Sequence, residues 1–87
     1  MSTTIKRTLI ANRGEIAFRI SKTLKKMKIQ SVGLCIPDER QSAFLNLCDN
    51  VVVFKQNELA AYLNIPEIIR IALDSKCDSI HPGYGFI

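Results

Sequence analysis

The sequence predicts an α/β fold, a Rossmann-like parallel sheet of four strands alternating with three helices. Apolar residues switch along the chain between short strand-like runs and helical spacing, and the connecting segments are short. This alternation favours a parallel sheet with helices packed on its faces. No repeat, linker or low-complexity tract divides residues 1–87, so we expect one domain. Its end on Phe86 and Ile87, with no polar residue after them, indicates a truncated domain.

The first half of the chain contains two expected strands around a long helix. Residues 8–11 are a short apolar run before Asn12 and Gly14, which is typical of a buried strand. From Glu15 the spacing becomes helical, and strand character returns over residues 30–36. The stripe of this helix expected to face the core consists of Ile16, Ala17, Ile20, Leu24 and Met27.

The second half repeats the alternation. Residues 42–49 are expected to form a short helix, and residues 51–54, all β-branched or aromatic, a strand. Residues 55–63 are expected to form a polar loop, and residues 79–81 begin a last strand.

Between the expected loop at residues 55–63 and the last strand lies a helix whose first residues carry a clear N-terminal signal. Asn64 is a candidate N-cap, Pro66 lies in the first turn and Glu67 comes three residues after the cap. The expected apolar face of this helix consists of Ile65, Ile68, Ile69, Ala72 and Leu73.

Composition narrows the classes of function. Twelve basic and eight acidic residues give a net charge of +4, which is too mild for a typical nucleic-acid binder. The cluster at Lys22, Lys25, Lys26 and Lys28 is either a solvated helix face or a patch for an anion or a partner.

Cysteine usage and hydropathy point to an intracellular chain. The cysteines are odd in number, widely spaced and without a metal-ligand pattern, so we expect reduced thiols and no metal site. No run approaches the roughly 18 apolar residues of a membrane span, and we expect a cytoplasmic location.

Two loops at the carboxyl ends of strands could carry chemistry, because ligands of doubly wound sheets bind there. Residues 11–16 contain one glycine, so neither a dinucleotide fingerprint nor a P-loop is present. The simpler interpretation is that Gly14 permits a tight turn while Arg13 and Glu15 pair with neighbouring loops.

Residues 81–86 follow the last strand on the same rim. Gly83 and Gly85 would allow close backbone approach or positive φ around Tyr84, whose phenol and ring suit a planar polar ligand. A purely structural role for the two glycines is equally open. His81 has no second histidine or acidic cluster beside it in the sequence, which favours a structural role over a role as a ligand or a base. The sequence contains no Ser-His-Asp arrangement or carboxylate pair, so no catalytic residue is assigned.

Residues 9–17 (Leu-Ile-Ala-Asn-Arg-Gly-Glu-Ile-Ala) and 81–86 (His-Pro-Gly-Tyr-Gly-Phe) resemble the two signature stretches of the biotin carboxylase N-terminal domain. Residues 62–66 resemble the family's helix-opening segment, so the match runs in order along the whole chain. The resemblance implies a Rossmann-like domain that precedes an ATP-grasp domain. It also implies that the complete enzyme carboxylates carrier-bound biotin with ATP, bicarbonate and Mg²⁺ or Mn²⁺.

The resemblance also implies roles for particular residues. Tyr84 and Gly85 match family positions at the biotin or bicarbonate pocket. Asn12, Arg13 and Glu15 match a wall between this domain and those that follow. The family's ATP-binding, metal-binding and catalytic residues all match positions after residue 87.

The first helix of the family contributes to a homodimer interface, and the matching outward positions here are Arg19, Lys22 and Lys26. Many members have an acidic residue four positions after a basic one on this helix, where Lys22 is here followed by Lys26. Like charges at this spacing destabilise a helix and remove a possible interface ion pair. Lys28 replaces the glycine that commonly ends the helix.

The leading hypothesis is a fragment of a biotin-dependent carboxylase, inactive alone, whose partners are the remaining biotin carboxylase domains, the biotin carboxyl carrier and a carboxyltransferase. The parent could serve acetyl-CoA, propionyl-CoA, methylcrotonyl-CoA, pyruvate or urea. The alternatives are a stand-alone regulatory module that pairs with a carboxylase subunit, and a free-standing nucleotide-binding domain. A domain that lacks its last elements would expose apolar surface, so we also expect self-association or strand exchange.

Overall fold

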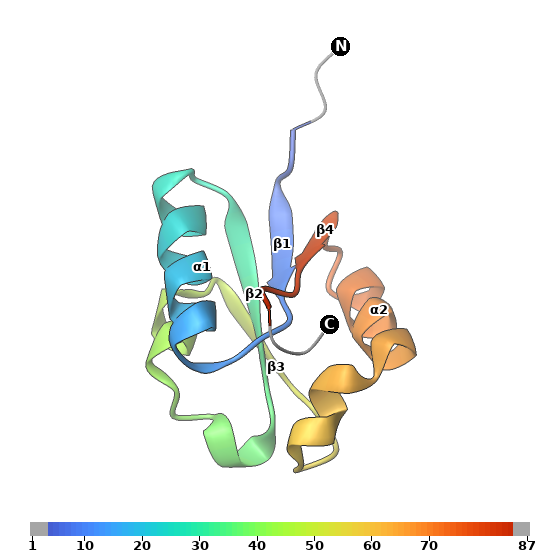
Figure 1. Cartoon of the computed structure of the whole chain (residues 1–87). Helices are drawn as coiled ribbons and strands as arrows, with labels where there is room; N and C mark the ends of the chain where they lie inside the picture. Colours follow the sequence, from blue (N-terminus) through green and yellow to red (C-terminus); the bar gives the residue numbers. More distant parts are fainter. Residues whose placement is uncertain (1–3, 85–87) are drawn as a thin grey trace.

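A computed structural model describes residues 4–84 and confirms the α/β fold class. Four parallel strands form one sheet in the order β3-β2-β1-β4, so β1 lies in the interior beside the last strand of the chain (Figure 1). The strands are β1 (Arg7–Ile10), β2 (Gln30–Cys35), β3 (Asn50–Val53) and β4 (Ser79–His81).

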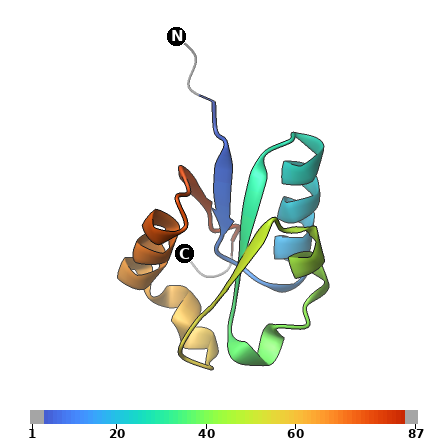
Figure 2. The same ribbon diagram turned by 180° about the vertical axis from the view of Figure 1, so that it is seen from behind.

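Helices cover both faces of this sheet. On one face lie α1 (Gly14–Lys26) and the 3₁₀ helix η2 (Ala43–Leu47), and on the other lie α2 (Ile65–Asp74) and the 3₁₀ helix η3 (Leu59–Leu63) (Figure 2). Because side chains alternate along a strand, Leu9 packs under α2 and Ile10 under α1. A further 3₁₀ turn, η1 (Pro37–Glu39), follows β2. No helix within residues 4–84 is long and apolar enough to span a bilayer.

Two expectations about the helical segments need correction. The expected helix over residues 42–49 is the short 3₁₀ helix η2. The expected polar loop over residues 55–63 ends in η3, where Ala61 and Tyr62 are buried in the core. The ring of Tyr62 meets that of Phe54 edge-to-face at 5.2 Å between centroids, a favourable aromatic geometry. This contact draws the loop onto the sheet.

The buried faces of both α-helices also differ from the predicted stripes. Helix α1 buries Ala17, Ser21 and Leu24, whereas Met27 is exposed. The hydroxyl of Ser21 is satisfied because it donates to the carbonyl of Phe18 at 2.8 Å. The helix contains more apolar residues than one face can bury. Which of them become buried depends on how the helix packs against the sheet.

Helix α2 shows the same effect more strongly. It buries Ile68, Ile71 and Ala72, whereas Ile65, Ile69 and Leu73 of the predicted stripe are exposed. These three lie at i, i+4 and i+8, which leaves an uncovered apolar stripe along the outer side of α2. The predicted cap is confirmed, since the Asn64 side chain accepts the Glu67 N–H at 3.2 Å.

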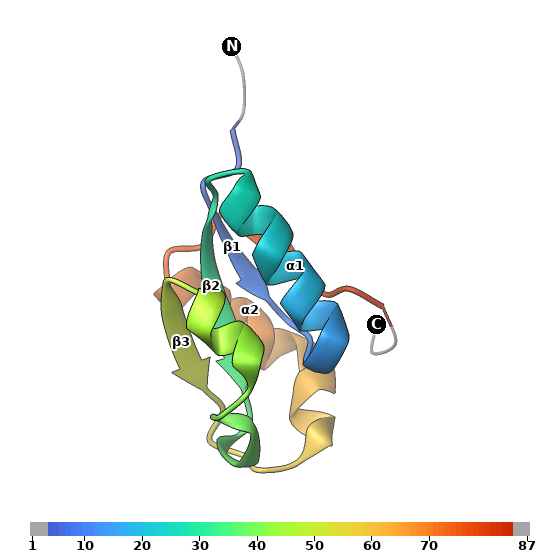
Figure 3. The ribbon, with the colours of Figure 1, turned by 90° about the vertical axis from the view of Figure 1, so that its left-hand side faces the viewer.

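Gly33 in β2 lets η2 approach the sheet closely. A Cβ at this position would lie 2.7 Å from Cδ2 of Leu45 and 2.9 Å from Sγ of Cys48. Any larger residue would push η2 outward, and η2 lies directly beside α1 (Figure 3). Gly33 therefore sets the spacing of this face of the domain.

Candidate functional site

The two sequence motifs at opposite ends of the chain meet at the buried side chain of Asn12. Its Nδ2 donates to the carbonyl of Pro82 at 2.6 Å and to that of Tyr84 at 3.0 Å. Its Oδ1 accepts the N–H of Arg13 at 2.7 Å. Since β4 lies beside β1, the carboxyl ends of these strands bring the two loops to one rim.

The turn that follows β4 is shaped by Gly83. This residue has φ +65°, and a Cβ there would lie 2.7 Å from Cγ2 of Ile16 and 2.8 Å from Nδ2 of Asn12. Its N–H donates to Nδ1 of His81 at 3.1 Å. The prediction of close backbone approach and positive φ is thus confirmed at Gly83, and Nδ1 of His81 holds this turn by accepting the Gly83 N–H. Gly85 and Phe86 lie outside the described residues.

A pocket of about 460 Å³ opens between the start of α1 and this turn. Tyr84 stands at its edge with 73% of its surface exposed, while its backbone carbonyl is fixed by Asn12. The lining comes from both motifs: Glu15, Ile16, Arg19, Ile20, His81, Gly83 and Tyr84. This pocket is the candidate functional site, because a phenol, a guanidinium and a carboxylate border it beside apolar side chains.

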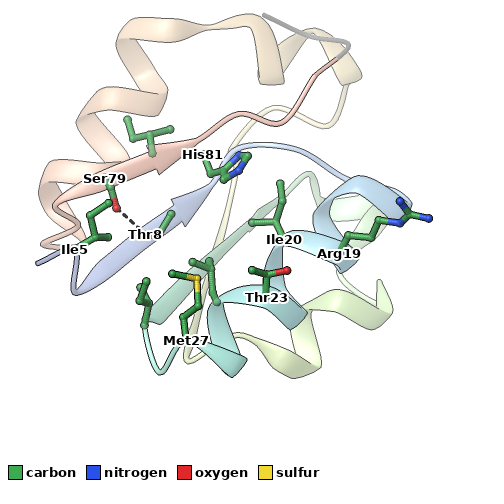
Figure 4. Close-up of a pocket in the computed structure, with 11 residues that line it drawn as sticks. Ile5, Thr8, Arg19, Ile20, Thr23, Met27, Ser79 and His81 are labelled. Carbon is green, nitrogen blue, oxygen red and sulfur yellow. Dashed lines mark hydrogen bonds between the residues drawn. The ribbon is translucent and has the colours of Figure 1, made fainter.

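An apolar groove of about 430 Å³ adjoins it between α1 and the edge strand β4 (Figure 4). Ile20 of α1 and Met27, which follows α1, lie on one side of the groove, and Ser79 and His81 of β4 lie on the other. Inside it, the hydroxyls of Thr8 and Ser79 are 2.7 Å apart and hydrogen-bonded. His81, Arg19 and Ile20 line both cavities, so the two form one continuous surface.

A second polar cluster lies at the carboxyl ends of β1 and β2. Nε of Arg13 lies 2.9 Å from both carboxylate oxygens of Glu39, and its NH2 group pairs with the same carboxylate. The buried Tyr62 donates its hydroxyl to Glu39 at 3.2 Å. Hydrogen bonds from Arg13 hold the pKa of Glu39 below its ordinary value, and burial raises the pKa of Tyr62. This cluster ties the first loop to η1 and η3.

The prediction that Arg13 pairs with a neighbouring loop is therefore confirmed, but the same prediction for Glu15 is wrong. Glu15 pairs at 3.2 Å with Arg19 in its own helix, because the two residues are one helical turn apart. Sequence reasoning missed Glu39 as the partner of Arg13. The signal was available, since Glu39 follows β2 just as Arg13 follows β1 in the neighbouring strand.

The proposed interface residues Arg19, Lys22 and Lys26 are exposed on α1, and Lys28 follows it with φ +61°. That value confirms the strained left-handed ending expected where lysine replaces glycine. The assignment of Asn12, Arg13 and Glu15 to an interdomain wall, and of α1 to a dimer interface, stays a prediction.

The cysteines are free thiols, and burial raises the pKa of Cys35, Cys48 and Cys77. A raised pKa keeps a thiol protonated and unreactive at neutral pH. Among residues 4–84, no group of three or more His, Cys, Asp or Glu side chains could hold a metal ion.

Fold and site together define a parallel α/β domain of Rossmann-like type with a shaped turn at the rim of its sheet. A model of the family described as "Biotin carboxylase, N-terminal domain" matches residues 4–87. The chain belongs to this family.

Individual relatives agree with this assignment. The biotin carboxylase of Nostoc sp. is 42% identical over 80 residues, which is 91% of this chain and 18% of the relative. The 2-oxoglutarate carboxylase small subunit of Hydrogenobacter thermophilus is 38% identical over 82 residues, 94% of this chain and 17% of the relative.

A solved structure confirms the fold. The biotin carboxylase domain dimer of the Hydrogenobacter thermophilus 2-oxoglutarate carboxylase, in complex with MgADP, ADP and bicarbonate, superposes with a TM-score of 0.92 at 36% identity. The match covers 98% of this chain and 19% of that one. The chain thus spans less than a fifth of these relatives and corresponds to their N-terminal domain. This correspondence favours a carboxylase domain over the stand-alone module.

Proposed function

We propose that this chain acts as the N-terminal domain of a biotin carboxylase, whose complete enzyme carboxylates carrier-bound biotin with ATP and bicarbonate. The observation that carries the proposal is the family match over residues 4–87 together with the Asn12 contact that joins both family motifs. We expect the chain to be inactive alone, because the family's ATP-binding, metal-binding and catalytic residues match positions after residue 87.

Within the complete enzyme, this domain supplies one wall of the biotin or bicarbonate pocket. The exposed phenol of Tyr84, held on a turn that Asn12 and Gly83 fix, can hydrogen-bond and stack on a small polar ring. Gly85, next along the chain, is proposed to let the backbone approach the same ligand. A rigid turn is suited to this task because little entropy is lost when the ligand binds.

Other components are proposed to come from outside this chain. Biotin is the group carboxylated, and ATP with Mg²⁺ or Mn²⁺ supplies the activation chemistry when bound. Residues 4–84 do not fit a metal, so the metal would be held elsewhere in the complete enzyme. The carrier and the carboxyltransferase are proposed partners, and the location proposed for the enzyme is the cytoplasm.

A chimera tests the proposal. Residues 1–87 replace the matching segment of the Nostoc biotin carboxylase, and ATP cleavage that depends on biotin and bicarbonate is measured. We expect turnover by the folded chimera and none by the isolated chain. Turnover by the isolated chain, or a folded chimera without activity, would contradict the proposal.

The role of Tyr84 is tested in the same chimera. Tyr84→Ala should raise KM for free biotin by about tenfold, as expected for one lost hydrogen bond and stacking contact. Tyr84→Phe, which keeps the ring, separates the two contributions. An unchanged KM in both variants would remove Tyr84 from the pocket.

A further inference from the structure

The third family motif, residues 62–66, begins with a tyrosine that helix capping does not explain. Asn64 caps α2, whereas Tyr62 precedes the helix and is buried. Its ring packs on Phe54, and its hydroxyl donates to Oε1 of Glu39 at 3.2 Å. Because a phenylalanine would fill the same space, the hydroxyl indicates a role besides packing.

The acceptor of that hydroxyl, Glu39, also holds Arg13. Nε of Arg13 lies 2.9 Å from both carboxylate oxygens, and its Nη2 pairs with Oε2. The side chains of Arg13 and Glu39 are only 38% and 20% exposed, so water screens their attraction less than at a fully exposed pair. A guanidinium bound at two nitrogens by one carboxylate has little freedom to rotate. Contacts from η1 and η3 therefore fix the side chain of Arg13.

The backbone N–H of Arg13 determines which way the amide of Asn12 points. This N–H donates to Oδ1 of Asn12 at 2.7 Å, while Nδ2 donates to the carbonyls of Pro82 and Tyr84. If the amide were rotated by half a turn, Oδ1 would face two carbonyl oxygens and Nδ2 would face an N–H. Only one orientation satisfies all three neighbours, and it depends on where the N–H of Arg13 lies.

These contacts form an unbroken series of hydrogen bonds from the core to the candidate site. We call Tyr62, Glu39, Arg13 and Asn12 the polar network. Its last member binds the backbone of the turn that carries Tyr84, whose exposed side chain borders the pocket. Within residues 4–84, no buried side-chain nitrogen or oxygen lacks a hydrogen-bond partner, and a fully satisfied network is rigid.

We propose that Arg13 is a positioning residue for biotin, which acts through Asn12 on the turn that carries Tyr84. Neither Arg13 nor the two side chains that hold it, Glu39 and Tyr62, line the pocket, so their effect on a ligand is indirect. This inference rests on the proposed function, since it requires that Tyr84 contacts biotin.

A purely structural role of the polar network predicts a different result. If Arg13 only stabilised the fold, its loss would lower the amount of active enzyme, which lowers the apparent kcat and leaves both KM values unchanged. A positioning residue shifts Tyr84 and therefore changes KM for biotin. It leaves KM for ATP unchanged, because the family's ATP-binding residues match positions after residue 87.

The first experiment uses the full chain and needs no activity. Heteronuclear NMR in dilute solution follows the side-chain amide of Asn12 and the backbone amide of Gly83 in Glu39→Gln. The matched control is Glu67→Gln, since Glu67 also binds one arginine through both carboxylate oxygens. We expect both resonances to shift in Glu39→Gln and to stay in place in the control. Unmoved resonances in Glu39→Gln, or equal shifts in the control, would overturn the proposal.

The second experiment uses the chimera with the Nostoc biotin carboxylase. Arg13→Gln and Glu39→Gln should each raise KM for free biotin about three- to tenfold and change KM for ATP by less than about twofold. Glu67→Gln should change neither value. If Glu39→Gln fails to fold by circular dichroism, Tyr62→Phe replaces it, because it removes only the hydroxyl, and KM for biotin should still rise about twofold. A loss of kcat alone, or equal rises in both KM values, would establish the structural role instead.

A double-mutant cycle in the chimera isolates the action through Tyr84. In Tyr84→Ala, adding Arg13→Gln should raise KM for biotin by less than about twofold, since the side chain that the network positions is already absent. If the two effects multiplied in full, Arg13 would not act through Tyr84. An inactive parental chimera would contradict the proposed function, whereas unmoved NMR resonances would contradict the polar network alone.

Discussion

The side-chain amide of Asn12 donates a hydrogen bond to the carbonyl oxygen of Pro82 across 70 residues of sequence, at 2.6 Å. Asn12 is buried. Its Nδ2 also donates to the carbonyl of Tyr84, and its Oδ1 accepts the N–H of Arg13. One side chain therefore fixes both loops of the candidate site.

Replacing Asn12 by alanine should lower the free energy of unfolding by about 2–3 kcal/mol, because partly buried carbonyls lose their donor. Urea unfolding followed by circular dichroism measures the change. Asn46→Ala, at an exposed position of η2, is the control and should cost less than about 0.5 kcal/mol. A similar loss of unfolding free energy in both variants would show that the Asn12 hydrogen bonds do not stabilise the fold.

Alanine at Gly83 should destabilise the chain more than alanine at Gly14. Both glycines have positive φ, +65° and +63°, but only at Gly83 would a Cβ meet other atoms within 4 Å. We expect about 1 kcal/mol for Gly14→Ala from backbone strain alone. Gly83→Ala should cost about 2–4 kcal/mol, since Asn12 and Ile16 must also move. Equal thermal midpoints for the two variants would refute the close approach.

Acid should weaken the fold partly through Glu39. Its pKa is lowered in the folded state, so its stabilising contribution is complete above the ordinary value of 4.5 and is lost as the pH falls through the folded value. Glu39→Gln should be less stable at pH 7 and lose less stability than the parent between pH 5 and about pH 2. Urea titrations across this range measure both effects.

Part of the acid sensitivity should survive in that variant. Backbone N–H groups of Lys6 and Arg7 lower the pKa of Asp78, which remains in place. Glu58→Gln removes an exposed carboxylate and is the control. A parental pH profile in Glu39→Gln would show that the Arg13 pair does not act on stability.

The exposed apolar stripe of α2 should cause self-association of the isolated chain. Ile65, Ile69 and Leu73 are 47%, 46% and 70% exposed, and contiguous exposed apolar surface favours association. Sedimentation velocity should show concentration-dependent oligomers that Ile69→Lys/Leu73→Lys abolishes. If Val51→Lys/Val53→Lys, on the edge strand β3, were the only variant to give monomers, strand pairing would be the cause instead.

The strands and the N-cap of α2 could be predicted because their signals are local. Residues 8–11 and 79–81 are strands within one residue of expectation, and Asn64 caps α2 as its side chain suggested. The buried faces could not be predicted. Whether Ile69 or Ile71 turns inward depends on how α2 lies across the twisted sheet, and both are equally apolar.

The two loops of the candidate site could be predicted from the sequence, but the contacts that join them to each other and to the core could not. Residues 11–16 and 81–84 were placed on one rim correctly, since the carboxyl ends of parallel strands coincide. The hydrogen bonds of Asn12 could not be predicted without the strand order, because they form only if β4 pairs directly with β1. The burial of Tyr62 depends on its contact with Phe54. Both the strand order and this contact join segments that are separated in the sequence, so no local pattern predicts them.

The strand order has a consequence for synthesis. A ribosome makes β2 and β3 between β1 and β4, yet β1 and β4 are neighbours in the sheet. The hydrogen-bond donors of Asn12 find their acceptors only when residues 82–84 leave the exit tunnel. Until then, the nascent chain holds an open sheet edge and an unpaired amide, so the sheet is completed only after the fourth of these strands has been made.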